Sequence, residues 1–70
     1  MNYVWKRLSY SDVQRLIEKH DLNENEQKIL KLLRKGKSHR AIANEIMYSI
    51  RTVEDYARRI YVKVKNDLWG

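Results

Sequence analysis

Few residues of this chain can do covalent chemistry, and their spacing assembles no reactive site. The chain has no cysteine, so disulfides, thiolate zinc sites and thiol nucleophiles are excluded. His20 and His39 are the only imidazoles, and neither belongs to a pattern typical of a metal site or a catalytic dyad. Ser38 and Ser49 precede predicted helices and are explained as caps. We therefore predict no catalytic residue, no metal ligand and no cofactor, and no small-molecule site is evident.

Charge is the chemistry that the chain does carry. Fifteen Lys and Arg residues stand against nine Asp and Glu residues, which gives a net charge of +6. Such an excess suits a polyanion or an acidic partner. Residues 1–35 and residues 36–70 each carry +3, so the excess is not a basic tail. An anion-binding surface must therefore be assembled by folding.

Length and composition predict one small helical domain. The chain has 70 residues, of which 43% are apolar and 34% charged, with two glycines and no proline. A chain this short buries only about 60% of its unfolded surface, which leaves a homodimer open. No apolar run is long enough to span a membrane, and residues 1–8 lack the apolar stretch of a secretory signal. We expect a cytoplasmic protein that does not insert into membranes.

Apolar periodicity and caps predict two helices in the first half of the chain. The first runs over residues 10–20 and can be capped by Ser9 or Ser11. The second runs over residues 24–35, where Asn23 and Glu26 have the spacing of a capping box and Gly36 ends the helix. The apolar residues of the two helices recur at helical spacing and are Val13, Leu16, Ile17, Ile29, Leu30, Leu32 and Leu33.

The next two helices are separated by a very short turn. One is predicted over residues 39–47 and the other over residues 50–65, with only Tyr48 and Ser49 between them. This is the spacing of a helix-turn-helix unit, and Ala43 supplies the small side chain needed where its two helices cross. The predicted fold is all-α: a small four-helix domain with a tri-helical helix-turn-helix core plus an extra N-terminal helix.

A set of residues in the same region follows a family pattern in register and without a gap: Leu22, Glu26, Ile29-Leu30, Leu32-Leu33, Gly36-Lys37-Ser38, Ile42-Ala43, Ile46, Ser49, Thr52-Val53, Ile60-Tyr61 and Lys63. In this pattern the stretch from Leu22 to Val64, 43 of the 70 residues, resembles the LuxR-type (GerE-like) helix-turn-helix of bacterial transcription regulators. The resemblance implies a sequence-selective regulator that binds double-stranded DNA. It divides the single domain, residues 1–70, into an extension helix, 1–21, and a LuxR-like unit, 22–65.

The resemblance also implies where DNA is contacted. In the family the last helix of the unit enters the major groove. The resemblance therefore implies that Glu54, Asp55 and Arg58 contact base edges. The family usually has Lys where this chain has Glu54, but a carboxylate can accept from cytosine N4, and arginine can bind guanine O6 and N7. The predicted DNA-binding residues are Ser49, Arg51, Thr52, Glu54, Asp55, Arg58, Arg59 and Lys63, with Lys37 and Ser38 as phosphate contact candidates.

Other interpretations stay open. The cations of the last helix could be only its solvated face, and Glu54 and Asp55 could instead face a transcription-machinery protein such as RNA polymerase, a sigma factor or another regulator. RNA binding would need an aromatic stacking platform, whereas Trp5, Trp69 and the tyrosines fit a core better. The N-terminal helix could cover the surface that a further C-terminal helix covers in the family, or Trp5 could form a homodimer contact.

Overall fold

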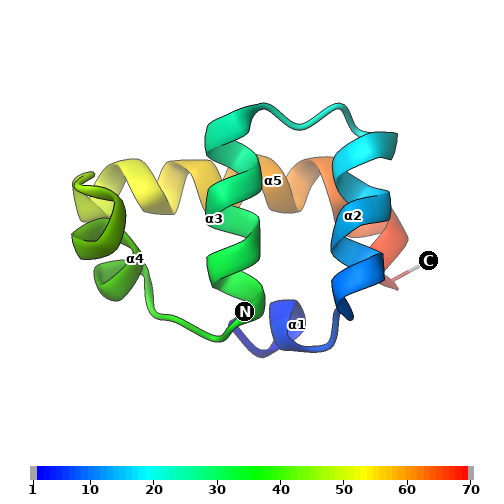
Figure 1. The fold of residues 1–70 in the computed structure, drawn as a ribbon, viewed down its shortest axis with the longest axis horizontal. Helices are drawn as coiled ribbons and strands as arrows, with labels where there is room; N and C mark the ends of the chain where they lie inside the picture. Colours follow the sequence, from blue (N-terminus) through cyan, green and yellow to red (C-terminus); the bar gives the residue numbers. More distant parts are fainter. Residues whose placement is uncertain (1, 70) are drawn as a thin grey trace.

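One helix lies at the centre of the fold and the others pack around it. The structure is a computed structural model that describes residues 2–69, with side chains described for residues 4–68. Within residues 2–69 it contains five helices and no strand: α1 (Asn2–Lys6), α2 (Tyr10–Lys19), α3 (Glu24–Arg34), α4 (His39–Ile46) and α5 (Ile50–Trp69). The central helix is α3, which contacts each of the other four. Figure 1 shows α4 and α2 on its two sides and α5 running behind it. The all-α prediction is confirmed.

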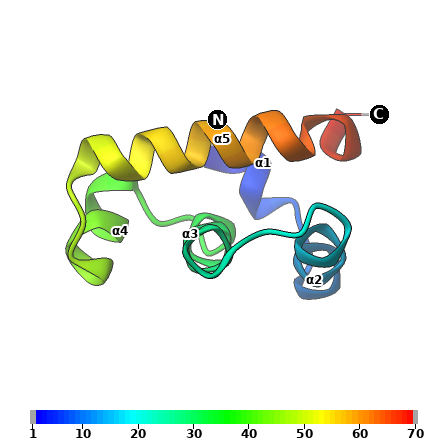
Figure 2. The ribbon, with the colours of Figure 1, turned by 90° about the horizontal axis from the view of Figure 1, so that it is seen from above.

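The helices form two layers. The long helix α5 makes one layer, and α4, α3 and α2 lie side by side in the other (Figure 2). The short helix α1 contacts α3 and also reaches α5 through an aromatic pair. None of the described helices combines the length and apolar content needed to cross a lipid bilayer. The arrangement leaves one long side of α5 uncovered.

Side-chain caps start the helices at the predicted residues. Of the two serines that could cap α2, the structure uses Ser9, whose Oγ accepts from the Asp12 N–H at 3.1 Å, while the Asp12 carboxylate accepts from the Ser9 N–H at 3.0 Å. The predicted box at α3 also forms, with distances of 2.8 and 3.0 Å between Asn23 and Glu26. Because the next residue in each case caps the C-terminus, α2, α3 and α4 end one residue earlier than predicted.

The N-terminal segment belongs to the core of the domain. The Trp5 side chain is 2% exposed, and its ring meets the Tyr61 ring of α5 edge to face, with 6.1 Å between the centroids. Of the two roles left open for Trp5, the structure therefore supports covering the core, since a buried indole is not available to a second copy. The buried apolar residues around it include Val13, Leu16, Ile29, Leu30, Leu33, Ile42, Val53, Ile60 and Val64.

Two features of the fold differ from the prediction. Residues 2–6 form a helix that the sequence did not indicate, because five residues form a stable helix only when tertiary packing supports them. The last helix continues past the predicted end at residue 65 to Trp69, because Leu68 packs against the core and Asp67 bonds the Lys19 and His20 side chains of α2. The side chain of Trp69, predicted to serve the core, lies outside the described side chains.

Candidate nucleic-acid interface

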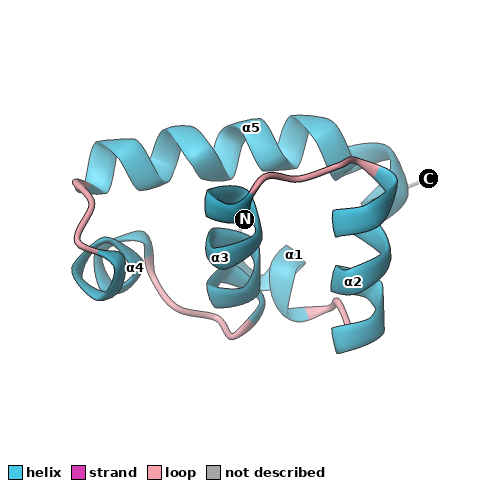
Figure 3. Cartoon of the chain, turned by 45° about the horizontal axis from the view of Figure 1, so that its top comes forward, coloured by secondary structure: helices cyan, strands magenta, loops and turns pink. Residues whose placement is uncertain are grey.

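The turn between α4 and α5 positions the candidate interface. Buried side chains hold the two helices together, with Ile42 and Ala43 on α4 and Val53 on α5 all at 3% exposure or less. The turn is closed by a hydrogen bond of 2.9 Å from the Tyr48 N–H to the Ala43 carbonyl oxygen. Figure 3 shows this loop as the short link at the end of the molecule. Ala43 thus has the role that the sequence predicted for it, and the turn fixes how α5 is presented.

The phosphate contact candidates Lys37 and Ser38 lie at the start of α4, and the predicted DNA-binding residues Ser49 and Thr52 lie at the start of α5. The Ser49 Oγ accepts from the Thr52 N–H at 3.1 Å and shares a hydrogen bond of 2.8 Å with the Thr52 hydroxyl. Ser38 caps α4 through the Ala41 N–H at 3.1 Å. Lys37 Nζ lies 3.3 Å from the Glu45 carboxylate, in an exposed pair. The three hydroxyls are therefore occupied in local capping bonds, while Lys37 keeps its charge at the surface.

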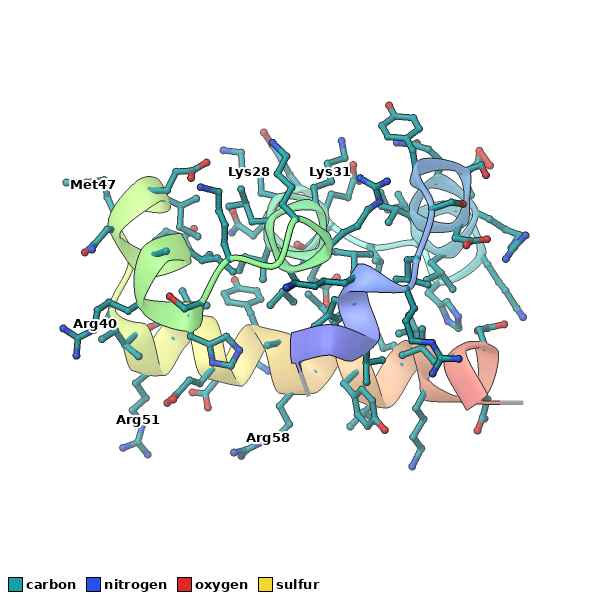
Figure 4. The ribbon with its side chains drawn as sticks, turned by 90° about the horizontal axis from the view of Figure 1, so that it is seen from below. Lys28, Lys31, Arg40, Met47, Arg51 and Arg58 are labelled. Carbon is teal, nitrogen blue, oxygen red and sulfur yellow. The ribbon has the colours of Figure 1, made fainter. Side chains whose placement is uncertain are left out.

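One side of α5 is exposed and charged. Arg51, Glu54, Asp55 and Arg58 recur at helical spacing opposite the buried stripe of this helix, and all four are exposed. We call these four residues the outer face of α5. Figure 4 shows Arg51 and Arg58 projecting away from α3, and two helical turns separate them, roughly 10 Å along the axis. Within the described part of the chain, none of the four has an ion-pair partner.

Arg40 of α4 adds a positive charge beside this face, whose two arginines and two carboxylates otherwise balance, and the sequence did not indicate this role. Its side chain is exposed and projects at the end of the molecule that adjoins Arg51 (Figure 4). No ion pair holds it within residues 4–68. The periodicity of α4 indicates that Arg40 is exposed, because this residue lies off the apolar stripe formed by Ile42, Ala43 and Ile46. Periodicity does not tell which exposed side of α4 adjoins α5, so the residue could not be assigned.

Two predicted DNA-binding cations contact other residues of the domain instead. Lys63 Nζ lies 2.8 Å from the Glu26 Oε2 atom, and Glu26 is only 3% exposed. The Arg59 guanidinium lies over the Tyr56 ring at 5.7 Å, and the Tyr56 hydroxyl accepts from Asn25 Nδ2 at 3.4 Å. These contacts turn both cations toward the start of α3. The structure therefore separates them from Arg51 and Arg58, and their contact with DNA stays a prediction.

The buried carboxylate of Glu26 is kept ionised by these neighbours. Burial by itself would raise the pKa of Glu26, but the hydrogen bonds from Lys63 and the Asn23 N–H, together with the charges of Lys63 and Arg59, outweigh it and lower the pKa. The cations on this side of α5 thus stabilise the junction between α3 and α5.

His20 and Asp67 form a further ionisable contact, between α2 and α5. Among residues 2–69 no three His, Cys, Asp or Glu side chains gather as a metal site would require. The His20 imidazole bonds Asp67 at 2.7 Å, which ties α2 to the end of α5. The Asp67 carboxylate also accepts from Lys19, and these two hydrogen bonds lower the pKa of Asp67. His39 lines a shallow hollow of about 280 Å³ beside Glu54 and Arg58.

Comparison with known proteins agrees with this geometry. Residues 20–67, 48 of the 70 residues, match the family model described as bacterial regulatory proteins, luxR family. The match spans α3, α4 and all but the last two residues of α5. The chain matches neither a curated protein nor a solved structure. The family model thereby confirms the resemblance seen in the sequence, and the chain belongs to the LuxR family of bacterial regulatory proteins, a family of DNA-binding transcription regulators and not of enzymes.

Proposed function

We propose that this DNA-binding regulator reads double-stranded DNA with the outer face of α5 seated in the major groove. The observation that carries the proposal is the row formed by Arg51 and Arg58 on the uncovered side of the second helix of the helix-turn-helix. The major groove is about 12 Å wide and admits one helix. A helix that exposes a full side along its length, as α5 does, fits this groove.

Each cation of the surface has a distinct task. Arg58 lies on the second exposed turn of α5 and binds guanine O6 and N7, a contact worth about 1–3 kcal/mol of discrimination. Arg51 and Arg40 lie nearer the turn and bind phosphates on either side of the groove. The first-turn amides of α4 and α5, apart from the one in each helix that the capping serine holds, add phosphate contacts typical of helix N-termini.

Glu54 and Asp55 give the surface its selectivity. An exposed carboxylate repels phosphate but accepts a hydrogen bond from cytosine N4. Glu54 lies between Arg51 and Arg58 along the helix, so it meets a base edge next to the guanine bound by Arg58. The repulsion between these carboxylates and the phosphates is therefore offset only on sites with a suitably placed cytosine.

The experiment compares two variants that remove one positive charge each. Arg58→Ala acts on the outer face, and Lys31→Ala acts on an exposed residue of α3. Fluorescence anisotropy with selected and random duplexes measures affinity against salt. Arg58→Ala is expected to lose about 1–3 kcal/mol on the selected duplex and to relax preference at one base pair, whereas Lys31→Ala stays close to wild type. Equal losses for both variants on every duplex contradict the proposal.

The two carboxylates support a second candidate function, a module that binds a protein of the transcription machinery. A double variant, Glu54→Lys with Asp55→Val, separates the two. If Glu54 reads cytosine, the variant loses preference at that base pair and gains affinity mainly for duplexes that lack the cytosine, since two repulsive charges are gone and one positive charge is added. If the carboxylates serve a protein partner, the variant binds duplexes more tightly with its base preference unchanged.

We also propose that the regulator binds DNA as a homodimer on half-sites about one helical turn apart. The proposal is supported by the small size of the domain, because one short helix supplies few base contacts. Light scattering during size exclusion, run with and without duplex, measures the stoichiometry. One copy per duplex at saturation contradicts the dimer.

A further inference from the structure

A basic surface lies on the side of the molecule opposite the outer face of α5. Lys28, Lys31 and Lys35 recur at spacings of three and four residues, so they share one face of α3, and all three are exposed. Figure 4 shows Lys28 and Lys31 projecting in the direction opposite to Arg51 and Arg58. These lysines therefore form a surface separate from the proposed DNA interface.

The lysines border a hollow whose floor is apolar. The hollow lies between α3 and α4 and has a volume of about 550 Å³, within the usual range of about 300–1,000 Å³ for ligand pockets. Leu32, Ile46 and Met47 supply its apolar side chains. We call it the α3–α4 hollow. Its combination of positive rim and apolar floor calls for a ligand with both negative and apolar groups.

The positive charges of the rim are not balanced from within the described residues. Lys28, Lys31 and Lys35 have no ion-pair partner there, and the one carboxylate at the hollow, on Glu45, is already held by Lys37 at 3.3 Å. Like charges at these spacings repel one another and weaken a helix. An acidic ligand would relieve this repulsion, which is the charge complementarity that identifies the occupant.

Met47 adds an apolar group that the fold itself does not use. Its side chain is 87% exposed, and its backbone has a φ of 62°, a left-handed conformation that disfavours residues other than glycine. The side chain contributes nothing to the core between α4 and α5. A flexible thioether adapts to irregular apolar partners. The position thus combines backbone strain with an exposed contact group at the edge of the α3–α4 hollow.

We propose that the α3–α4 hollow docks an acidic amphipathic helix of a partner protein. Carboxylates of the partner pair with Lys28, Lys31 and Lys35, and its apolar residues at helical spacing fill the floor beside Met47. A nucleic acid backbone offers the charge but no apolar side chains for the floor. Since the hollow opens away from the outer face of α5, the domain can hold this partner and a duplex together.

The first experiment locates the binding of a defined probe. The full chain, labelled with ¹⁵N, is titrated with a synthetic helical peptide that carries Leu on one face and Glu and Asp on its flanks. Amide shifts are expected at Lys28, Lys31 and Met47 and not at Arg51 or Arg58. Matched peptides with Lys for the acidic residues, or Ser for Leu, are expected not to bind. No binding of the acidic peptide, or shifts centred on α5, overturns the proposal.

The second experiment uses variants whose loss of peptide affinity cannot be attributed to unfolding. Lys31→Glu is expected to weaken peptide binding about tenfold, whereas Lys65→Glu, the same charge change on exposed α5, changes it less than about twofold. Met47→Gly removes the thioether and relieves the left-handed strain, so it should raise Tm while weakening the peptide. Unchanged affinity in either Lys31→Glu or Met47→Gly overturns the proposal.

Measurements of duplex binding distinguish failure of the docking proposal from failure of the proposed DNA interface. Lys31→Glu and Met47→Gly are expected to bind duplex as wild type does, and the peptide is expected to bind the duplex complex as it binds the free domain. If peptide and duplex compete, both bind one surface. This result overturns the proposed docking site and leaves the DNA-binding proposal intact. If the duplex does not bind at all, peptide binding still stands on its own.

Discussion

Replacing Lys63 with Met tests the junction between α3 and α5. The Lys63 Nζ atom lies 2.8 Å from a carboxylate oxygen of Glu26, and Glu26 is 3% exposed. The variant keeps most of the aliphatic length of the side chain and removes its ammonium group. The carboxylate then stays buried with the Asn23 N–H, at 3.0 Å, as its remaining hydrogen-bond partner and with the charge of Arg59 still acting on it. We expect a loss of stability, since a buried charge without its counterion is unfavourable.

The magnitude follows from the exposure of the two partners. Removing one partner of a fully buried pair costs about 3–5 kcal/mol, and a hydrogen bond to a charged group contributes about 1.5–3 kcal/mol. Because the Lys63 side chain is 43% exposed, water reaches its end of the pair and the lower range applies. A loss of about 2 kcal/mol lowers the Tm of a domain this size by roughly 8–16 °C.

The stabilisation by the Lys63–Glu26 pair depends on pH. The pKa of Glu26 is lowered in the folded state, below its ordinary value of 4.5. The contribution of the pair is therefore fully present above pH 4.5 and is lost as pH falls through the lowered pKa. The difference between wild type and Lys63→Met should thus be full near neutral pH and shrink in acid.

Urea unfolding followed by circular dichroism, at neutral and acidic pH, measures this difference. Lys65→Met is the matched control, because Lys65 is exposed and has no ion-pair partner in the described part of the chain. In a Glu26→Gln background Lys63→Met should cost little, since the amide keeps its acceptor for Asn23. An equal cost in both backgrounds, or at both pH values, refutes the reasoning. A salt slope for duplex binding that falls by about 0.9 would assign Lys63 a phosphate contact as well.

Three further predictions concern the helices that frame the interface. Trp5→Ala should cost about 3–5 kcal/mol and leave much of the chain unfolded, and a native far-ultraviolet spectrum would contradict this. Ser49→Ala should lose about 1 kcal/mol by removing the acceptor for the Thr52 N–H, whereas Ser49→Gly loses only a few tenths, and equal Tm values for the two would argue against the cap. Asp67 has a pKa lowered chiefly by its hydrogen bond from Lys19, so its contribution is present above pH 3.8 and lost in acid. The Tm of Asp67→Asn should therefore fall less on acidification than that of wild type.

Local signals predicted most of the fold. Ser9, Asn23, Ser38 and Ser49 cap helices at the predicted residues, because capping depends only on near neighbours in the chain. Residues 2–6 could not be predicted as a helix in this way. Their helix depends on packing between segments far apart in the sequence, and no local pattern encodes that packing.

The candidate site was predictable only in part, for the same reason. Periodicity places Arg51 and Arg58 outside the buried stripe of α5, and the structure agrees. The same periodicity leaves Lys63 outside that stripe, but it cannot show that a carboxylate of α3 comes within 2.8 Å of it. Arg40 was missed because its position next to α5 depends on how two helices cross. The local sequence determines which face of a helix is exposed. The residues that come close to that face depend on how distant segments pack.

The burial of Trp5 against α5 makes the domain one cooperative unit. Because α1, α2 and α5 share a single core, we expect them to unfold in the same transition. A duplex that binds only the folded state therefore stabilises α1 and α2 as much as the helix it touches. We therefore expect the helix-turn-helix to lose stability when residues 1–21, which supply Trp5, Val13 and Leu16 to this core, are removed. Its affinity for DNA is set partly by residues at the other end of the sequence, which determine how much of the chain is folded and able to bind.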